Sequence, residues 1–243
     1  IDALDWSDYD VVFCALPHGT TQDVVATIPA TTAVVDVSAD FRLAPDVYAQ
    51  WYGQPHRAPA RQDDAVYGLT EFARDAVRSA RLVACPGCYP TCALLPLSPL
   101  VEAGAVDADR IVIDAKSGVS GAGRALKEGS LYAEVAEAVH AYGVGHHRHM
   151  AELDMVLSAA AGRPVAPSFT PHLMPMNRGM LTTSYVETTD GRDAQALHAV
   201  LAERFGGQPF VRILPFGQTP ATRHVRGSNL CLIGVAADRR PGR

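Results

Sequence analysis

The stretch that organises this chain is ACPGCYPT, residues 84–91. Residues 81–85 form a mostly apolar run that predicts a short buried strand, and the Pro-Gly pair after it turns the chain sharply. The apolar segment Thr91–Ala103 predicts a helix. Cys88 is therefore expected where a strand end meets a helix start, and unpaired backbone N–H groups at such a place favour an anion. A cysteine there spends more time as thiolate, the nucleophilic form of the side chain.

The segments before this stretch predict a parallel α/β sheet. Residues 10–16, DVVFCAL, are nearly all apolar, as in a parallel strand that is covered on both faces. A turn follows at 17–19, and residues 20–28 can form a helix capped by its first threonines. A second apolar run at 33–38 completes a strand–helix–strand unit of about thirty residues. Residues 39–42 then leave the carboxyl edge of the sheet, where open α/β sheets bind ligands.

The segments after residue 91 predict a different layer. Residues 110–116 read as another buried strand, while residues 53–74 earlier in the chain look irregular. Helical periodicity is expected over 131–142 and 150–161. Beyond Pro164 the pattern favours strands at 168–174, 181–188, 210–214 and 230–237. One helix is predicted among them, at 193–205. The chain is thus predicted to be α/β first and then α+β, with an antiparallel or mixed sheet.

Composition places the chain among ordinary globular proteins. It has 243 residues, 48% of them hydrophobic and 19% charged, and its net charge of −5 does not suggest a nucleic-acid or membrane-surface partner. No apolar run approaches the ~18 residues that span a bilayer, and the first residues lack the pattern of a signal peptide. The five cysteines are an odd number, and three of them lie between residues 85 and 92. We therefore expect a reducing compartment, the cytoplasm, and no disulfide framework.

The cysteines leave more than one interpretation open. Cys88 reads as a nucleophile or as a structural thiol, whereas Cys14, Cys92 and Cys231 lie in apolar segments typical of structural cysteines. Cys85 and Cys88 form a C-x-x-C pair, which is also typical of a redox dithiol or of half a zinc site. The three clustered cysteines are too close together for a clean tetrahedral set, so no metal site is predicted.

A histidine cluster follows at His146, His147 and His149, directly before a predicted helix. Acyl transfer to a thiol needs an acid or base that titrates near the working pH, and histidine is the natural choice. Glu152 lies one helical turn after His149 and could orient that ring or the ring of His147. The alternative is a solvated loop that contains histidines by chance.

Two segments are candidates for anion recognition. Residues 117–124, SGVSGAGR, follow a predicted strand, and their small side chains would let backbone N–H groups approach an anion closely. Arg124 could clamp a phosphate there, although a flexible Gly/Ser turn is the alternative. Residues 226–229, RGSN, could bind a carboxylate or an amide through Arg226, or could form a simple hairpin turn.

Taken together, these motifs give the chain a recognisable pattern. It resembles the N-acetyl-gamma-glutamyl-phosphate reductases of the semialdehyde dehydrogenase family over essentially all 243 residues. The resemblance is carried by ALPHG (15–19), SADFRL (38–43), PGCYPT (86–91), KSGVSGAGR (116–124), GHHRH (145–149), SFTPHL (168–173), PMNRG (175–179) and RGSN (226–229). The chain departs from the family pattern at Cys85, where an asparagine is usual, and at Met150-Ala151, where Thr-Pro is usual.

The resemblance implies an NADPH-dependent reductive dephosphorylation in arginine biosynthesis. Cys88 would attack the acyl phosphate of N-acetyl-L-glutamyl 5-phosphate, and hydride from NADPH would reduce the resulting thioester to N-acetyl-L-glutamate 5-semialdehyde. The match implies the acid–base role for His149, with His147 beside it. Aspartate-semialdehyde dehydrogenase shares this chemistry and is the alternative within the class. A thiol-redox or zinc protein built on the C-x-x-C pair, and a non-catalytic fragment, are alternatives outside it.

The resemblance also implies where ligands bind. The NADP site would include Leu16, Pro17, His18 and Ser38, together with Ser120 and Gly121. The substrate and its phosphate would contact Ser117, Gly118, Arg124 and Arg226. A partial Rossmann-like dinucleotide-binding domain is expected over 1–87 and a catalytic and dimerisation domain over 88–243, in a homodimer or homotetramer. The family's Gly-rich fingerprint and its C-terminal return segment are not found, so we expect a fragment that lacks both termini.

Overall fold

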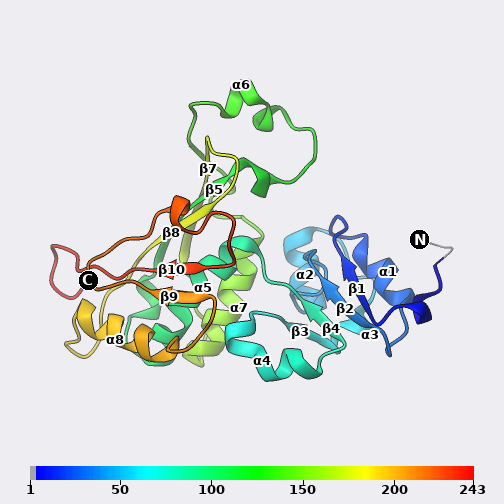
Figure 1. The fold of residues 1–243 in the computed structure, drawn as a ribbon, viewed down its shortest axis with the longest axis horizontal. Coiled ribbons are helices and arrows are strands. Elements are labelled where there is room, and N and C mark those ends of the chain that lie inside the picture. The colour runs from blue at the N-terminus through cyan, green and yellow to red at the C-terminus, as the bar shows by residue number, and fades with distance from the viewer. Residues whose placement is uncertain (1–3) are drawn as a thin grey trace. The chain divides into compact units, whose positions relative to one another are not determined.

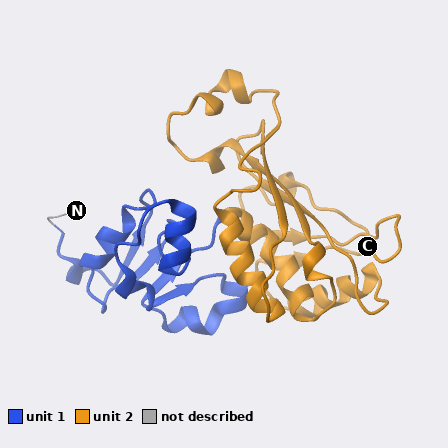
Figure 2. Ribbon diagram, turned by 180° about the vertical axis from the view of Figure 1, so that it is seen from behind, with its two compact units in different colours: residues 1–87 blue, residues 88–243 orange. Residues whose placement is uncertain are grey.

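The computed structural model describes residues 4–243, so the first three residues of the expected domain 1–87 lie outside it. The chain divides into two compact units, the first ending at Gly87 and the second beginning at Cys88 (Figure 2). Each unit has its own sheet (Figure 1), and each is described by itself.

Unit 1 contains a parallel four-stranded sheet in the order β1-β2-β4-β3, which confirms the expected α/β fold. Its strands are β1 (Val11–Cys14), β2 (Ala33–Asp36), β3 (Ala65–Tyr67) and β4 (Leu82–Ala84). Its helices are α1 (Thr21–Thr27), α2 (Pro45–Tyr52), α3 (Pro59–Gln62) and α4 (Thr70–Ser79). The core of the unit forms where apolar side chains from α1, β2 and β4 meet, at Val25, Ile28, Val34 and Leu82. Burying each such side chain contributes about 1.5–3 kcal/mol.

Strand β1 differs from its prediction. Cys14 is buried, but the alternate side chains Val11 and Phe13 are 46% and 72% exposed. Successive side chains of a strand point to opposite faces, so only the Val12 and Cys14 face of β1 packs on the core. The expectation that both faces are covered is wrong, because an apolar composition does not reveal which face has a partner.

Two local predictions in unit 1 are also wrong. Residues 53–74, expected to be irregular, contain α3, β3 and the start of α4. Helix α3 and strand β3 are only four and three residues long, too short for a periodic pattern to reveal them, and none of the residues of α4 is buried. Thr20 precedes α1 but makes no side-chain cap, and the carboxylate of Asp40 accepts from the first turn instead.

Unit 2 contains the expected mixed sheet, in the order β6-β7-β5-β8, and a separate parallel pair, β9 with β10. The central strand β5 pairs parallel with β7 and antiparallel with β8. The strands are β5 (Val112–Gly118), β6 (His140–Ala141), β7 (Ser168–Met174), β8 (Met180–Tyr185), β9 (Val211–Ile213) and β10 (Cys231–Ile233). The longer helices are α5 (Cys88–Glu102), α7 (His149–Ala161) and α8 (Ala194–Arg204). Helix α5 packs against α7, α8 and β8, so the apolar core lies between sheet and helices.

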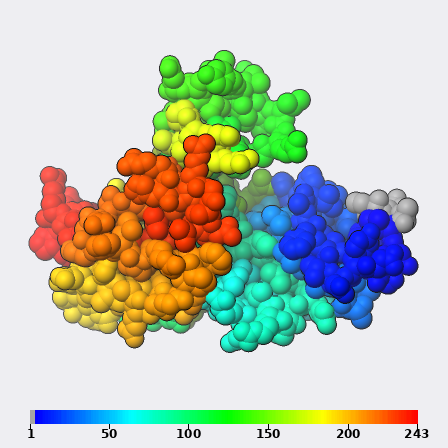
Figure 3. All heavy atoms as spheres, in the orientation of Figure 1, coloured from blue at the N-terminus to red at the C-terminus, as the bar shows by residue number. Residues whose placement is uncertain are grey.

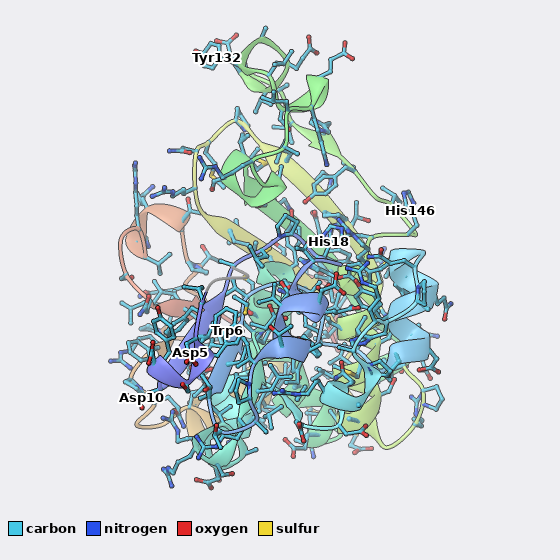
Figure 4. The ribbon with its side chains drawn as sticks, turned by 90° about the vertical axis from the view of Figure 1, so that its right-hand side faces the viewer. Asp5, Trp6, Asp10, His18, Tyr132 and His146 are labelled. Carbon is cyan, nitrogen blue, oxygen red and sulfur yellow. The ribbon has the colours of Figure 1, made fainter. Side chains whose placement is uncertain are left out.

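An arm joins β5 to β6 and stands out from the rest of unit 2 (Figures 1 and 3). The helix predicted over 131–142 is reduced there to the single turn α6, Tyr132–Val135. Tyr132, at the tip of the arm in Figure 4, is 88% exposed, and Leu126 is fully exposed. Glu137 has a φ of 62°, which an α-helix does not tolerate. The prediction is wrong because the apolar residues of this segment have little to pack against, and short helices depend on packing.

Within residues 4–243, no helix combines the length and the apolar character that crossing a membrane requires.

Candidate active site

Cys88 is the first residue of α5 and follows the Pro86-Gly87 turn after β4, so the expected strand-to-helix junction is confirmed. Its side chain is exposed, whereas Cys14 is buried and Cys92 is half-buried. Burial raises the pKa of the Cys92 thiol, whose sulfur lies 3.4 Å from the Thr182 hydroxyl, and raises the pKa of Cys14 to about 11. Among the described cysteines, Cys88 is therefore the one best placed to act as a nucleophile.

The neighbouring thiol of Cys85 has a different environment. Burial raises its pKa, and the nearby charge of Asp36 raises it further. A raised pKa disfavours the thiolate that a redox dithiol or a zinc ligand needs. Over residues 4–243 the cysteines form no disulfide, and no group of three or more His, Cys, Asp or Glu side chains is arranged to hold a metal ion.

The predicted histidines His147 and His149 pack around the ring of Tyr89, the residue that follows Cys88 in the sequence. The ring of Tyr89, the residue after Cys88, lies 5.8 Å from the ring of His147 and 5.9 Å from that of His149, centroid to centroid. The two histidine rings are 4.8 Å apart, and Phe169 of β7 contacts His147 from another side. The third histidine, His146, is exposed and directs Nδ1 at the carbonyl of Val144.

His147 is held as a neutral ring. Its Nδ1 accepts a hydrogen bond from the backbone N–H of His149, at 3.1 Å, at the start of α7. Burial, together with the charges of Arg148 and His146, lowers the pKa of His147 to about 4. Near neutral pH the ring therefore carries its single proton on Nε2. The side chain acts as a cap for α7 and orients the backbone of His149.

His149 faces a buried carboxylate. Its Nε2 lies 4.0 Å from Oε1 of Glu152, three residues further along α7, and the Glu152 side chain is only 1% exposed. The geometry is that of a long ion pair, and it joins the two residues that the sequence analysis paired. A carboxylate in this position favours one orientation of the imidazole.

Two tyrosine hydroxyls complete the cluster. The Tyr89 hydroxyl donates to the carbonyl of His172, at 3.3 Å, and lies 3.0 Å from the hydroxyl of Tyr142. When Tyr89 gives its proton to the His172 carbonyl, Tyr142 is the donor of the bond between the two hydroxyls. Burial raises the pKa of both phenols, and negative charge on Cys88 adds to the rise for each. The sequence analysis missed these residues, although the position of Tyr89 inside the Pro-Gly-Cys turn could have identified it.

A cavity of about 1020 Å³ opens beside Cys88 within unit 2. Ser117 and Gly118, at the end of β5, and Ser120 and Gly121, just after it, line the cavity together with Cys88. The cavity continues along β8 and the segment 228–238. Arg124 and Arg226 are exposed and do not line it, so the structure does not bring these two predicted phosphate ligands to the others.

Gly118 is a sensitive point of this cavity wall. A Cβ at this position would lie 2.9 Å from the backbone of Arg178 and from the carbonyl of Asn177. We expect Gly118→Ala to lower the free energy of unfolding by about 1–3 kcal/mol, because backbone atoms cannot move away cheaply. Urea unfolding measures this change. Gly129→Ala is the control, since a Cβ there meets nothing within 4 Å, and equal midpoints for the two variants would contradict the prediction.

The predicted cofactor residues of unit 1 lie at the carboxyl edge of its sheet. Leu16, Pro17 and His18 form the loop after β1, in which His18 is labelled in Figure 4, and Ser38 follows β2, the parallel neighbour of β1. Pro17 and His18 are exposed and Leu16 is half-buried. The hydroxyl of Ser38 is buried and donates to Asp36 at 2.9 Å. The loop is therefore accessible to a ligand, whereas Ser38 is occupied within the protein.

Comparison with known proteins agrees with this geometry. Residues 1–80 match the family model described as semialdehyde dehydrogenase, NAD binding domain, and residues 88–243 match semialdehyde dehydrogenase, dimerisation domain. Among solved structures, aspartate semialdehyde dehydrogenase II from Vibrio cholerae is similar, with a TM-score of 0.68 at 18% identity over 96% of this chain and 71% of that one. A probable aspartate-semialdehyde dehydrogenase from Pseudomonas aeruginosa gives 0.65 at 19% identity, over 99% and 74%. The chain thus has the semialdehyde dehydrogenase fold.

Curated relatives narrow the class. The N-acetyl-gamma-glutamyl-phosphate reductase of Rhodospirillum rubrum is 59% identical to this chain over an alignment of 249 positions. The alignment covers 100% of this chain and 71% of the relative. The corresponding reductases of Afipia carboxidovorans and Ruegeria pomeroyi are 58% and 54% identical, over 71% and 70% of their lengths. The chain belongs to the N-acetyl-gamma-glutamyl-phosphate reductase family.

Proposed function

We propose that this chain performs the NADPH-dependent reduction of N-acetyl-L-glutamyl 5-phosphate to N-acetyl-L-glutamate 5-semialdehyde, a step of arginine biosynthesis. The observation that carries the proposal is an exposed cysteine at a helix start, with a histidine cluster around the next residue and a large cavity beside it. The curated relatives, named for this reduction at 54–59% identity, support it.

Cys88 is the nucleophile of the proposed reaction. Its thiolate attacks the carbonyl carbon of the acyl phosphate, the C–O bond to phosphate breaks, and inorganic phosphate leaves with the electron pair. Backbone N–H groups at the start of α5 favour the negative charge that develops on the carbonyl oxygen. The thioester that remains on Cys88 is the species to be reduced.

NADPH, when bound, supplies the hydride that reduces this thioester. Leu16, Pro17 and His18 would hold it in unit 1, and the match of residues 1–80 to an NAD binding domain supports that assignment. Ser38 would also belong to the NADPH site, because it lies after β2 at the same edge of the sheet. Ser120 and Gly121 would lie toward the nicotinamide end.

The substrate phosphate would bind near the end of β5. Ser117 and Gly118 line the cavity beside Cys88 and are the candidate ligands of the phosphate there. Arg124 and Arg226 are the proposed positive charges, although neither lines the cavity in this structure.

His149 is the proposed acid–base residue. It gives a proton to the departing phosphate, or to the Cys88 thiolate that is released when hydride adds to the thioester and the C–S bond breaks to leave the aldehyde. Glu152 orients its ring. His147 stays neutral and positions His149, since its Nδ1 is committed to the helix start.

The two units take different parts in this proposal. Unit 1 serves as the partial dinucleotide-binding domain, and unit 2 as the catalytic and dimerisation domain. The match of residues 88–243 to a dimerisation domain supports a homo-oligomer, a homodimer or homotetramer, and we place it in the cytoplasm.

The proposal is tested with the purified chain and two acyl phosphates. NADPH oxidation should follow addition of N-acetyl-L-glutamyl 5-phosphate and should be far slower with aspartyl 4-phosphate. Preference for aspartyl phosphate would favour the aspartate-semialdehyde dehydrogenase alternative. If neither acyl phosphate causes NADPH oxidation, both the proposed function and the aspartate-semialdehyde dehydrogenase alternative are contradicted.

The capping role of His147 gives a stability prediction. Its pKa is about 4 in the folded chain against an ordinary 6.5, so the unfolded chain binds the extra proton first. The free energy of unfolding should therefore fall as the pH is lowered from 6.5 toward 4 and be fully present above 6.5. His147→Asn keeps a capping oxygen and should remove this acid sensitivity. His147→Ala should cost about 1 kcal/mol at pH 7.

Urea unfolding of the three proteins at pH 7 and pH 5 measures this effect. An acid sensitivity that persists in His147→Asn would assign the pH dependence to another group.

A further inference from the structure

The carboxylate of Asp40 is the centre of a buried network in unit 1. Its Oδ1 accepts from the backbone N–H of Gly19 at 2.6 Å and from the Tyr48 hydroxyl at 2.9 Å. Its Oδ2 accepts from the backbone N–H of Gln22 at 3.2 Å. Asp40 is completely buried, and burial together with this bond raises the pKa of Tyr48 to about 12, so Tyr48 remains a donor at all ordinary pH values.

These bonds fix one particular turn of the chain. Gly19 ends the exposed loop that contains Pro17 and His18, and Gln22 lies in the first turn of α1. Gly19 has a φ of +83°, which favours glycine, and a Cβ there would lie 2.5 Å from Nε2 of Gln54. The loop therefore has one well-defined path, set by a residue about twenty positions later in the sequence.

The backbone of Asp40 is held as firmly as its side chain. Its carbonyl accepts from Nε2 of His56 at 2.8 Å, and its N–H donates to the hydroxyl of Ser38 at 3.1 Å. The ring of His56 packs edge-on against Phe41 and Tyr48. These bonds fix the position of Asp40, and that position determines the conformation of the loop.

We propose that Asp40 is a positioning residue for nucleotide binding, which holds the loop 16–19 in the conformation that receives the nicotinamide nucleotide. This inference rests on the proposed function, in which Leu16, Pro17 and His18 contact NADPH. Asp40 itself is buried beneath the loop and need not touch the ligand. Its negative charge strengthens both backbone hydrogen bonds, which an amide in its place would not do equally.

The test replaces the carboxylate by an amide. Asp40→Asn keeps one acceptor oxygen and puts an NH2 group where the other stood, so Gly19 or Gln22 loses its acceptor. We expect the dissociation constant for NADPH, measured by fluorescence titration, to rise about tenfold, as for one lost charge-assisted bond. The alkylation rate of Cys88 by iodoacetamide should stay unchanged, since a general loss of folding would alter both.

Asp23→Asn is the matched control. It removes a carboxylate charge from α1, the helix whose first turn donates to Asp40, but its partner is the exposed Arg57, so NADPH affinity should stay at the wild-type value. Tyr48→Phe removes a single bond to Asp40 and should weaken NADPH binding about threefold. It decides the question if Asp40→Asn does not fold.

Three results would overturn the inference. Wild-type affinity in Asp40→Asn, or in Tyr48→Phe where Asp40→Asn does not fold, would refute the positioning role and leave the proposed function standing. Equal weakening in Asp23→Asn would show a general charge effect. A wild-type chain without affinity for NADPH would refute the proposed function and this inference with it.

Discussion

Replacing Cys88 with serine is expected to lower turnover of N-acetyl-L-glutamyl 5-phosphate by ~10³-fold or more, because the hydroxyl of serine ionises far less readily than a thiol. The exposed position of Cys88 means that the change should not disturb packing. NADPH oxidation measures turnover, and mass spectrometry of the chain mixed with substrate alone detects the thioester. The variant should show neither signal and should unfold at the wild-type urea concentration.

Cys92→Ser is the control for this prediction. It makes the same sulfur-to-oxygen change one helical turn further along α5, where the Thr182 hydroxyl can bond to the new oxygen. Turnover should therefore persist in this variant. An active Cys88→Ser variant, or a thioester that still forms on it, would refute the nucleophilic role of Cys88.

The second large effect is expected at His149. His149→Gln should lower kcat by about 10²–10⁴-fold, the usual contribution of a positioned acid–base residue. Glutamine can still bond to Glu152, so the start of α7 should stay in place. The rate of Cys88 alkylation and the affinity for NADPH should both stay close to wild type, because the change removes proton transfer and leaves both binding sites intact.

His146→Gln is the matched substitution three residues earlier. His146 is exposed and bonds to its own loop, so kcat should be unchanged. A His149→Gln variant with wild-type kcat would assign the proton transfer to another group of this cluster, such as Tyr142, whose ring lies 5.5 Å from that of His147.

The predictable part of the fold was carried by local patterns with strong packing partners. Strand β7 matches the predicted 168–174, and helix α8 lies within the predicted 193–205, with Asp193 as its cap. The sequence of β7 alternates between apolar and polar residues, and α8 follows a capping residue. Both elements pack against the rest of unit 2. The junction at Cys88 was predictable for the same reason, because a Pro-Gly turn separates two apolar runs.

The wrong predictions concern long-range partners that a local pattern does not contain. The apolar residues 131–142 would form a helix only against a surface to pack on, and the arm provides little. The start of α1 looked like a threonine cap, yet its acceptor is Asp40. The residues around Thr20 do not reveal that a carboxylate about twenty positions later accepts these hydrogen bonds.

The candidate site was predictable in its residue types and less so in their division of labour. The spacing of His147 and His149 gave no reason to distinguish them. The structure gives His147 a distinct environment, since its Nδ1 accepts from a backbone N–H and burial lowers its pKa. Arg124 and Arg226 were predicted from their motifs, and a motif does not reveal whether a side chain reaches a cavity; neither residue lines it here.

The complete burial of Asp40 has a consequence for how solution conditions act on unit 1. Dissolved ions screen exposed charges over a Debye length of about 8 Å at 0.15 M, but they reach an enclosed carboxylate poorly. Potassium chloride should therefore weaken only the direct attraction between protein and phosphate groups. The conformation of the loop 16–19 should therefore be the same at low and at high salt concentration.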